Sequence, residues 1–424
     1  MSQTKSIIFF VIAGIIIILT SIFIGILPGK KQPAPAQATI EIWGLGERED
    51  IWRAAINSFT GKNKNLTIRY VRLDERTYEE TLINSLAAGR GPDIFMLKNS
   101  WILKHQNKIY PLPQVFFNFF PRDFRRTFVD ATSDDLIKDD IIAGLPLFVD
   151  TLALFYNKDI LNAAGIAIPP RDWDEVAERS RELTKISPTG DIITSGLALG
   201  TSQNIERSFE ILSALMIQAG DRIVNLQGRS VEFSNLGREA FSFYTSFANP
   251  SHKNFSWNNR MPSSFDAFAE GKAAMVIGLA EDLERIRAKN PHINMGVYPF
   301  PQLKNAKSFA SYTGYFFPAV SRQSKNPEAA WQFINFITLG EGLTPYLNAS
   351  KRPAARRDLL AAGSKNEELD IFYRQSLIAK SWPMPDEETT RRIFATAIDS
   401  VVQRSATTQE ALNKIQDQLR QLLK

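Results

Sequence analysis

The chain of 424 residues contains no cysteine. This absence excludes disulfides, thiolate metal sites, cysteine nucleophiles and the lipid-modified cysteine of lipoproteins. Histidine is scarce as well, since His105, His252 and His292 lie far apart and show no spacing typical of metal ligands. We therefore expect no metal site, and no motif in the sequence calls for a cofactor.

Motifs of nucleotide binding and nucleophilic catalysis are also missing. The glycine loop 44–49 lacks the third glycine of a dinucleotide fingerprint, and its two acids would repel a pyrophosphate. Neither a Walker A sequence nor a G-x-S-x-G elbow occurs. The paired acids Asp134-Asp135 and Asp139-Asp140 stand in polar stretches, where solvated loop acids are commoner than catalytic dyads. The pattern indicates binding, so we expect no enzyme and no catalytic residue.

Charge of one sign does not dominate the chain. The formal net charge is +5, which is small for this length, and no run of Lys and Arg alternates with aromatic residues. Nucleic-acid binding is therefore not expected.

A long uncharged run is present at the amino terminus, from Ser6 to Leu27. As a helix, Ile7 to Leu27 would be roughly 31 Å long, about one bilayer core. A Pro/Ala-rich spacer follows, so residues 1–38 are predicted to be a retained transmembrane anchor with its tether. The alternative is a signal segment cleaved at Ala36-Gln37-Ala38. Flanking lysines do not decide the orientation, but a large domain is exported largely regardless of them, so we expect it outside the cytoplasm. The alternative is a domain tethered inside the cell.

Beyond the spacer, apolar residues recur first at strand spacing and then at helix spacing. Ile40 and Ile42 alternate with polar residues, and a helical pattern and a second strand follow before the buried run 93–97. Strands that alternate with helices predict an α/β fold with a parallel sheet. Because ligands bind beyond the carboxyl ends of such strands, the loops 43–49 and 98–101 are candidate binding loops.

Several stretches match a known family in order and spacing. The chain resembles the extracellular solute-binding proteins of ABC importers, specifically the sugar-binding group that includes maltose-binding protein. The resemblance covers nearly all of Thr39 to Lys424, and each motif is weak alone while their joint order is specific. The stretches are Thr39 to Gly44, Ala88 to Phe95, Gly144 to Asp150 with Leu154 to Asp159, Asp172 to Glu175, Ala267 to Met275, Asn326 to Trp331 and Ser405 to Leu412.

This resemblance implies a two-lobed periplasmic-binding-protein fold, type II-like, in which each lobe is a mostly parallel sheet flanked by helices. Its implied first lobe is 39–149 with 312–340, and its second is 150–311 with 341–424. The chain would cross between lobes near 148–151, near 309–312 and after Gly340. It also implies a monomer that closes on a solute, has no catalytic residues, and delivers the solute to membrane permease subunits.

Sugar recognition requires aromatic faces for the apolar side of a pyranose and planar polar groups for its hydroxyls. Candidate residues were chosen where the two strand-end loops and the implied lobe crossings place such groups. Core packing, helix capping or a hinge salt bridge is the competing role for each of them. After Met275 many relatives carry a Gly-Trp pair, whereas this chain has Gly278-Leu279, which puts maltodextrin specificity in doubt. The candidates are Trp43, Glu47, Asn99, Ser100, Trp101, Asp150, Phe209, Glu281, Tyr312, Gly314 and Trp382.

Three other functions stay open on the sequence. The solute could be an oligopeptide, a polyamine, a phosphate ester or a metal complex. The fold could also serve a sensor or a surface adhesin, since fold does not fix function. A membrane-anchored α/β enzyme is disfavoured by the missing nucleophile motifs.

Overall fold

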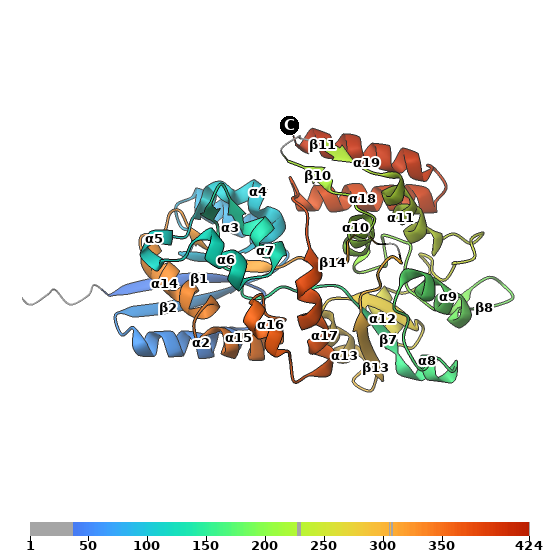
Figure 1. The fold of residues 1–424 in the computed structure, drawn as a ribbon, viewed down its shortest axis with the longest axis horizontal. Coiled ribbons are helices and arrows are strands. Elements are labelled where there is room, and N and C mark those ends of the chain that lie inside the picture. Colours follow the sequence, from blue (N-terminus) through green and yellow to red (C-terminus); the bar gives the residue numbers. More distant parts are fainter. Residues whose placement is uncertain (1–36, 227–229, 305, 307, 424) are drawn as a thin grey trace, which may run out of the picture.

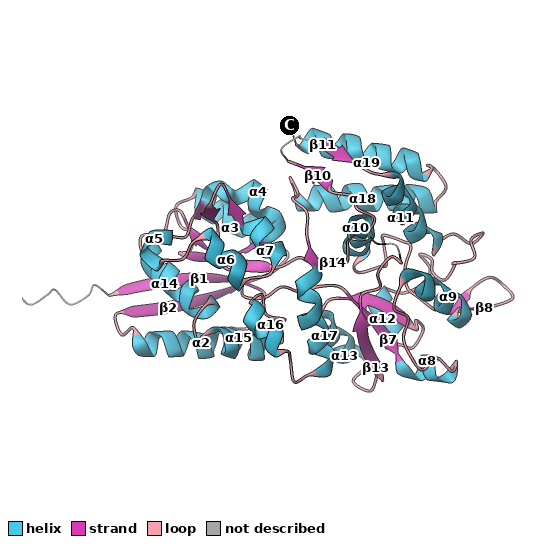
Figure 2. Ribbon diagram, in the orientation of Figure 1, coloured by secondary structure: helices cyan, strands magenta, loops and turns pink. Residues whose placement is uncertain are grey.

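Two separate apolar cores divide the protein into two lobes, which lie side by side along its longest axis (Figure 1). The computed structural model describes residues 37–423 except 227–229, 305 and 307. Both lobes combine helices with a small sheet, as the colouring of Figure 2 shows. The two-lobed α/β architecture predicted from the sequence is confirmed.

The first lobe is built on a five-stranded sheet in the order β2-β1-β3-β15-β4. β1 pairs in parallel with β2 and β3, whereas β15 runs antiparallel to β3 and β4. The predicted alternation holds, since Ile40 and Ile42 are fully buried. The strands are β1 (Ala38–Leu45), β2 (Leu66–Leu73), β3 (Ile94–Lys98), β4 (Ile109–Tyr110) and β15 (Phe316–Ser321), with a hairpin of β5 (Ile137–Lys138) and β6 (Ile141–Ile142) beside them.

Helices cover this sheet with the faces that the sequence predicted. Trp52, Ala55 and Phe59 form the buried face of the first of them. The helices of this lobe are α2 (Glu49–Lys62), α3 (Tyr78–Ala87), the 3-10 helix η1 (Asn99–Trp101), α4 (Ile102–His105), the 3-10 helix η2 (Gln106–Lys108), α5 (Gln114–Phe117), α6 (Pro121–Thr127), α7 (Asp130–Leu136), α14 (Pro327–Thr338), α15 (Leu343–Ser350) and α16 (Arg357–Ala362).

The second lobe has a three-stranded sheet in the order β12-β7-β13, and both pairings are antiparallel. The prediction of a mostly parallel sheet is therefore wrong for this lobe. A strand's own residues report its burial, but they do not report the direction of a partner more than a hundred residues away. The strands are β7 (Ala153–Asn157), β12 (Met275–Gly278) and β13 (Met295–Pro299), with the hairpins β8 (Lys185–Ile186) and β9 (Ile192–Thr194), and β10 (Ile223–Asn225) and β11 (Ser230–Glu232).

Helix caps in the second lobe follow the sequence signals. Asp172 accepts the Glu175 backbone N–H, and Thr407 forms a capping box with Glu410. The helices are α8 (Lys158–Ala163), α9 (Trp173–Leu183), α10 (Ser208–Gln218), α11 (Asn235–Ser246), α12 (Ser264–Ala269), α13 (Asp282–Lys289), α17 (Glu367–Gln375), the 3-10 helix η3 (Ser376–Ile378), α18 (Glu387–Val402) and α19 (Thr408–Leu422).

Crossing segments of the chain lie side by side between the lobes. β14 (Ser311–Tyr312) pairs with β16 (Ala379–Lys380), and Thr151 bridges to Thr313. The Thr313 hydroxyl donates to the Asp150 carbonyl oxygen over 2.6 Å. These contacts hold the crossing strands together at the base of the cleft.

The third crossing lies later than the sequence prediction placed it. Leu343, Tyr346 and Leu347 of α15 belong to the first-lobe core, and this helix packs on α2. The second-lobe segment, which was predicted to start at residue 341, therefore begins only after α16. The reason is that the apolar face of α15 packs into the core of the first lobe.

Among the described residues, no helix is both long enough and apolar enough to cross a membrane. The predicted anchor Ile7 to Leu27 lies outside the described residues.

Candidate functional site

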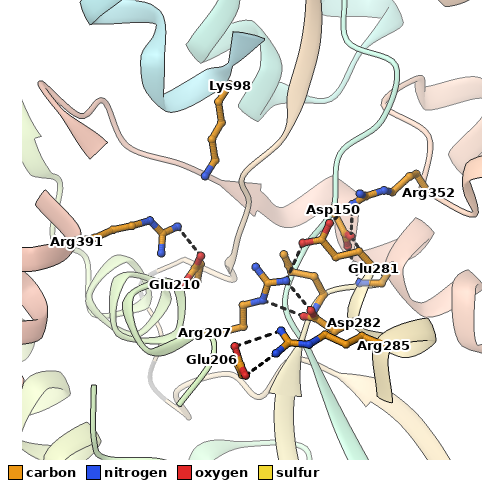
Figure 3. A network of polar contacts seen from close by, with 12 residues as sticks. Lys98, Asp150, Glu206, Arg207, Glu210, Glu281, Asp282, Arg285, Arg352 and Arg391 are labelled. Atoms are coloured by element: carbon orange, nitrogen blue, oxygen red, sulfur yellow. Dashed lines mark hydrogen bonds and ion pairs between the residues drawn. The ribbon is translucent and has the colours of Figure 1, made fainter. Parts of the chain in front are cut away.

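The lobes meet where β3, the crossing strands and β12 end. Lys98 closes β3 and η1 follows it, while Glu281 and Asp282 follow β12 in the other lobe. Figure 3 shows charged side chains from these loops converging between the lobes. Two groups of charged side chains occupy this junction: the Glu387 cluster (Lys98, Glu210, Glu387 and Arg391) and the Arg352 cluster (Asp150, Arg207, Glu281, Asp282 and Arg352).

The Glu387 cluster joins the first-lobe loop after β3 to the amino end of α18. Glu387 accepts from Lys98 Nζ at 2.6 Å, Ser100 Oγ at 2.7 Å and Trp101 Nε1 at 2.9 Å. Arg391, one helical turn later, donates to Glu387 at 2.8 Å. Burial alone would raise the pKa of Glu387, but the charges of Lys98 and Arg391 outweigh it and hold the pKa at about 2.

Arg391 extends this cluster into the second lobe. Its guanidinium donates to Glu210 of α10 at 2.6 Å and lies 4.7 Å from the centre of the Phe209 ring. In Figure 3, Lys98 points toward the space beside this Arg391–Glu210 pair. Lys98, Glu387, Arg391 and Glu210 thus form a chain of alternating positive and negative charges that runs from the first lobe into the second.

The Arg352 cluster lies at the other charged junction of the cleft. Arg352, from the first lobe, pairs with Glu281 at 2.7 Å, and Arg207 pairs with the same carboxylate at 2.7 Å. Burial opposes ionisation here, yet the two guanidinium groups hold the pKa of Glu281 well below its usual range. Arg207 also donates to Asp282 at 2.6 Å.

Asp150 has a structural setting that the sequence did not reveal. Its side chain is fully buried, and its two carboxylate oxygens accept the backbone N–H groups of Ala280 at 2.9 Å and Glu281 at 3.2 Å. Burial raises the pKa of Asp150 to about 6. A solute could not touch this side chain in the observed arrangement, in which it fixes the loop after β12.

The predicted residues of the first binding loop face inward. Trp43 is 9% exposed and its indole N–H donates to Glu41 at 2.6 Å. Glu47 accepts from Trp52 Nε1 at 2.8 Å and from the Tyr346 hydroxyl at 2.9 Å. Burial raises the pKa of Glu47. Trp43 therefore belongs to the first-lobe core, whereas Glu47 still borders the cleft.

The predicted residues of the second binding loop do lie at the cleft. The Trp101 ring is half-buried, with Phe316 edge-on at 5.8 Å and Tyr78 stacked at 6.4 Å. Asn99 donates to Asp135 at 2.9 Å, and Gly314 is partly exposed with room beside it toward Lys98. The structure thus brings Asn99, Ser100, Trp101 and Gly314 together.

Three predicted aromatic walls are core residues of the second lobe. Phe209 and Tyr312 rings meet at 6.1 Å, and Phe209 and Trp382 rings at 5.8 Å. Each is at least 96% buried, and Trp382 donates to Ser213 at 3.2 Å. As walls of the cleft these three predictions do not fit the structure, because an apolar ring at a lobe junction is buried more favourably in the core than on the rim.

Two hollows open at the cleft, and each is lined by both lobes. The Glu47 hollow, of about 960 Å³, lies among residues 45–48, 72–76, 280–284 and 349–352. The Asn99 hollow, of about 1090 Å³, is lined by residues 99–100, 102–103, 106–107, 109, 111, 134–139, 141, 143, 222, 224–226, 322, 381 and 383–384, so that Trp101 borders the cleft without lining this hollow. Volumes of this order accommodate small organic ligands.

Sequence reasoning missed the second-lobe half of the Glu387 cluster. Asp386, Glu387 and Glu388 open an amphipathic helix, where acids are expected simply because they favour the positive end of the helix dipole. The spacing of four residues from Glu387 to Arg391 was the available signal. Within the described residues, no group of three or more His, Asp or Glu side chains is arranged to hold a metal ion.

Comparison with known proteins gives a consistent set of similarities. The family model of the bacterial extracellular solute-binding proteins matches residues 45–342. A galactooligosaccharide-binding protein of Bacillus subtilis is 23% identical over 89% of this chain and 88% of its own. A putative binding protein of Brucella abortus is 23% identical over 66% of each chain, so the match spans just under two thirds of that relative.

Solved structures share the fold at lower identity. The sugar-binding protein MalE of Xanthomonas citri superposes with a TM-score of 0.78 at 18% identity, over 91% of this chain and 97% of its own. A cyclo/maltodextrin-binding protein complexed with maltotetraose gives 0.75 at 18%, over 92% and 98%. A solute-binding protein of Thermotoga lettingae bound to tagatose gives 0.72 at 22%, over 91% and 100%.

Proposed function

Because the chain belongs to the bacterial extracellular solute-binding protein family, we propose that it is the carbohydrate-binding subunit of an ABC import system. The solute enters the cleft between the lobes and is passed to permease subunits in the membrane. The amino-terminal segment keeps the protein at the outer face of that membrane. No catalytic step belongs to this role.

The observation that carries the proposal is the polar nature of the lobe junction. Ser100, Trp101 and Lys98 of one lobe reach Glu387 of the other through single hydrogen bonds or ion pairs, and Ser100 also lines the Asn99 hollow. Such contacts exchange readily for the hydroxyls of a sugar, because hydroxyls both donate and accept. The sugar ligands named for the similar proteins support the same class of solute.

Trp101 is the aromatic side chain best placed to meet a sugar. It is half-buried at the cleft and stacks on Tyr78 of its own lobe at 6.4 Å, a contact that opening of the lobes leaves in place. When the lobes open, the ring offers an apolar surface beside the polar groups of Asn99 and Ser100. Asp150 instead organises the loop after β12 through the backbone N–H groups of Ala280 and Glu281.

The proposal is tested by titrating the purified protein with mono- and oligosaccharides in a calorimeter after a thermal-shift screen. We expect a sugar to raise the melting temperature and Trp101→Ala to weaken its binding by about 1 to 3 kcal/mol. Trp101→Phe keeps the ring and should lose less. A shift with spermidine, a phosphate ester or a peptide but with no sugar would contradict the carbohydrate assignment.

A further inference from the structure

An exposed apolar patch lies on the first lobe, away from the cleft. Val115, Phe116 and Phe120 are 86%, 56% and 38% exposed, and we call them the aromatic patch. They belong to α5 and the turn that leads into α6. Large apolar side chains gathered in one short segment indicate a surface that meets a less polar medium than water.

The segment that carries the patch is firmly held from beneath. Phe117 and Phe119 pack against the first-lobe core, with the Phe119 and Phe124 rings 6.5 Å apart. Asn118 adopts the left-handed conformation at φ 47°, and the Phe119 N–H bonds to the Gln114 carbonyl at 3.1 Å. The turn thus directs alternate side chains inward and outward, so exposure of the patch is built into the fold.

Cationic side chains follow the patch immediately. Arg122, Arg125 and Arg126 are exposed on α6; Arg122 lies 3.9 Å from Asp123, and the charge of Arg125 acts on Asp134 at longer range. The nearby Asp130 is paired with Arg357. An apolar tip next to exposed arginines matches the profile of a membrane surface, with acyl chains below anionic headgroups.

The position of the patch agrees with this profile. In Figure 1, α5 and the start of β1 lie at the same end of the longest axis, opposite the second lobe. The chain therefore enters the folded part at the end that carries the patch. The spacer 28–37 spans at most roughly 35 Å when extended, which keeps this end close to the predicted anchor.

We propose that the aromatic patch inserts into the lipid–water interface of the membrane in which the chain is anchored, with the three arginines on anionic headgroups. This inference rests on the anchoring part of the proposed function and is independent of the solute. The first lobe then stands on the membrane by the end remote from the cleft. The second lobe is left free to move about the crossing strands.

The absence of cysteine permits a direct test on the full-length chain. Val115→Cys carries an environment-sensitive fluorophore, and the protein is reconstituted into vesicles of phosphatidylcholine with phosphatidylglycerol. Ile193→Cys on β9 of the second lobe, where Ile193 is 58% exposed, is the matched control. Quenching by nitroxide-labelled lipid is compared with quenching by aqueous iodide, in the absence of any solute.

We expect lipid quenching at position 115 and iodide quenching at position 193. Adding Phe116→Ser and Phe120→Ser should lower the partition of the labelled patch into lipid by about tenfold or more. Vesicles of phosphatidylcholine alone should give weaker lipid quenching, because the arginines then lack anionic partners.

Three results would overturn the inference in different ways. Association with the vesicles is measured by flotation in a density gradient. Iodide quenching at position 115 in a chain that floats with the vesicles would refute insertion of the patch and leave the membrane anchor intact. A chain that does not float would refute both the anchor and the insertion. Protection of position 115 from lipid and iodide together would place the patch against a second copy of the chain. Failure to bind any sugar would leave these readings unchanged.

Discussion

Asp135 shows how one carboxylate can be organised at the edge of the cleft. It is half-buried at the end of α7 and accepts from Ser381 Oγ at 2.7 Å, Asn99 Nδ2 at 2.9 Å and the Tyr315 hydroxyl at 2.9 Å. No cation contacts it in the described part of the chain, and burial raises its pKa to about 6. The reading of this acid as a solvated loop residue is therefore wrong.

This raised pKa predicts a pH dependence of stability. The ordinary pKa is 3.8, so folding takes up a proton at Asp135 between about pH 4 and pH 6. The resulting stabilisation is fully present below the unfolded pKa and is lost as the pH rises through 6. Between pH 5 and pH 7, the wild-type free energy of unfolding should fall by about 1 kcal/mol more than that of Asp135→Asn. Urea titrations of both proteins at the two pH values measure these free energies. The same change between pH 5 and pH 7 in the wild type and in Asp135→Asn would contradict the prediction.

At the scale of elements, helix ends and apolar faces were predictable because their signals are local. The capping box of α19 is one example, with the Glu410 N–H bonded to Thr407 Oγ1 at 3.2 Å and the Thr407 N–H to Glu410 Oε2 at 2.7 Å. Both bonds satisfy backbone N–H groups at the start of the helix, and donor and acceptor lie only three residues apart in the chain. No knowledge of the rest of the fold is needed to foresee them.

Removing this cap should lower the stability of the protein by a small amount. Thr407→Ala is expected to lower the free energy of unfolding by about 1 kcal/mol, since the Glu410 N–H loses its acceptor. Thr407→Asn, which offers a side-chain oxygen at the same place, should recover most of the loss. Chemical denaturation of the wild type and the two variants measures these free energies of unfolding. Equal losses of stability in Thr407→Ala and Thr407→Asn would show that the capping hydrogen bond is not the cause of the loss.

Other features depend on partners far away in the chain and could not be predicted. The strand pattern of β7 indicates burial, but the antiparallel direction of β12 and β13 follows from long connections. Phe209 and Trp382 read equally well as cleft walls or core, since both lie next to the lobe junction. Asn99, Ser100 and Trp101 were foreseeable because position after a strand is a local property, and their solute contact remains a prediction.

At the scale of the whole molecule, the lobes are held together by ion pairs instead of a shared apolar core. Arg352–Glu281 and Lys98–Glu387 each join one lobe to the other. Removal of one partner from such a pair is destabilising, because it leaves the other charge buried without compensation. Closure of the lobes is therefore sensitive to single side chains.

Glu387→Gln should shift the solute-free protein toward an open form. The change removes the negative charge that Lys98 and Arg391 share, which we expect to weaken closure by about 2 kcal/mol, or roughly thirtyfold in the equilibrium. Small-angle scattering should then give a larger radius of gyration than for the wild type.

The matched control is Glu206→Gln, which makes the same chemical change in an ion pair that lies within the second lobe, with Arg285 at 2.8 Å. Its radius should equal that of the wild type. An unchanged radius for Glu387→Gln, together with a wild-type melting curve, would mean that the cluster does not hold the lobes closed.

The position of β15 in the first-lobe sheet bears on how the protein is made. This strand lies between β3 and β4, yet it follows them only after most of the second lobe. A ribosome adds about 5 to 20 residues per second, so the nascent sheet waits on the order of ten seconds or more for its fifth strand. During that interval the edge of β3 is unpaired and open to pairing with other strands, so aggregation competes with folding until residues 316–321 have been made.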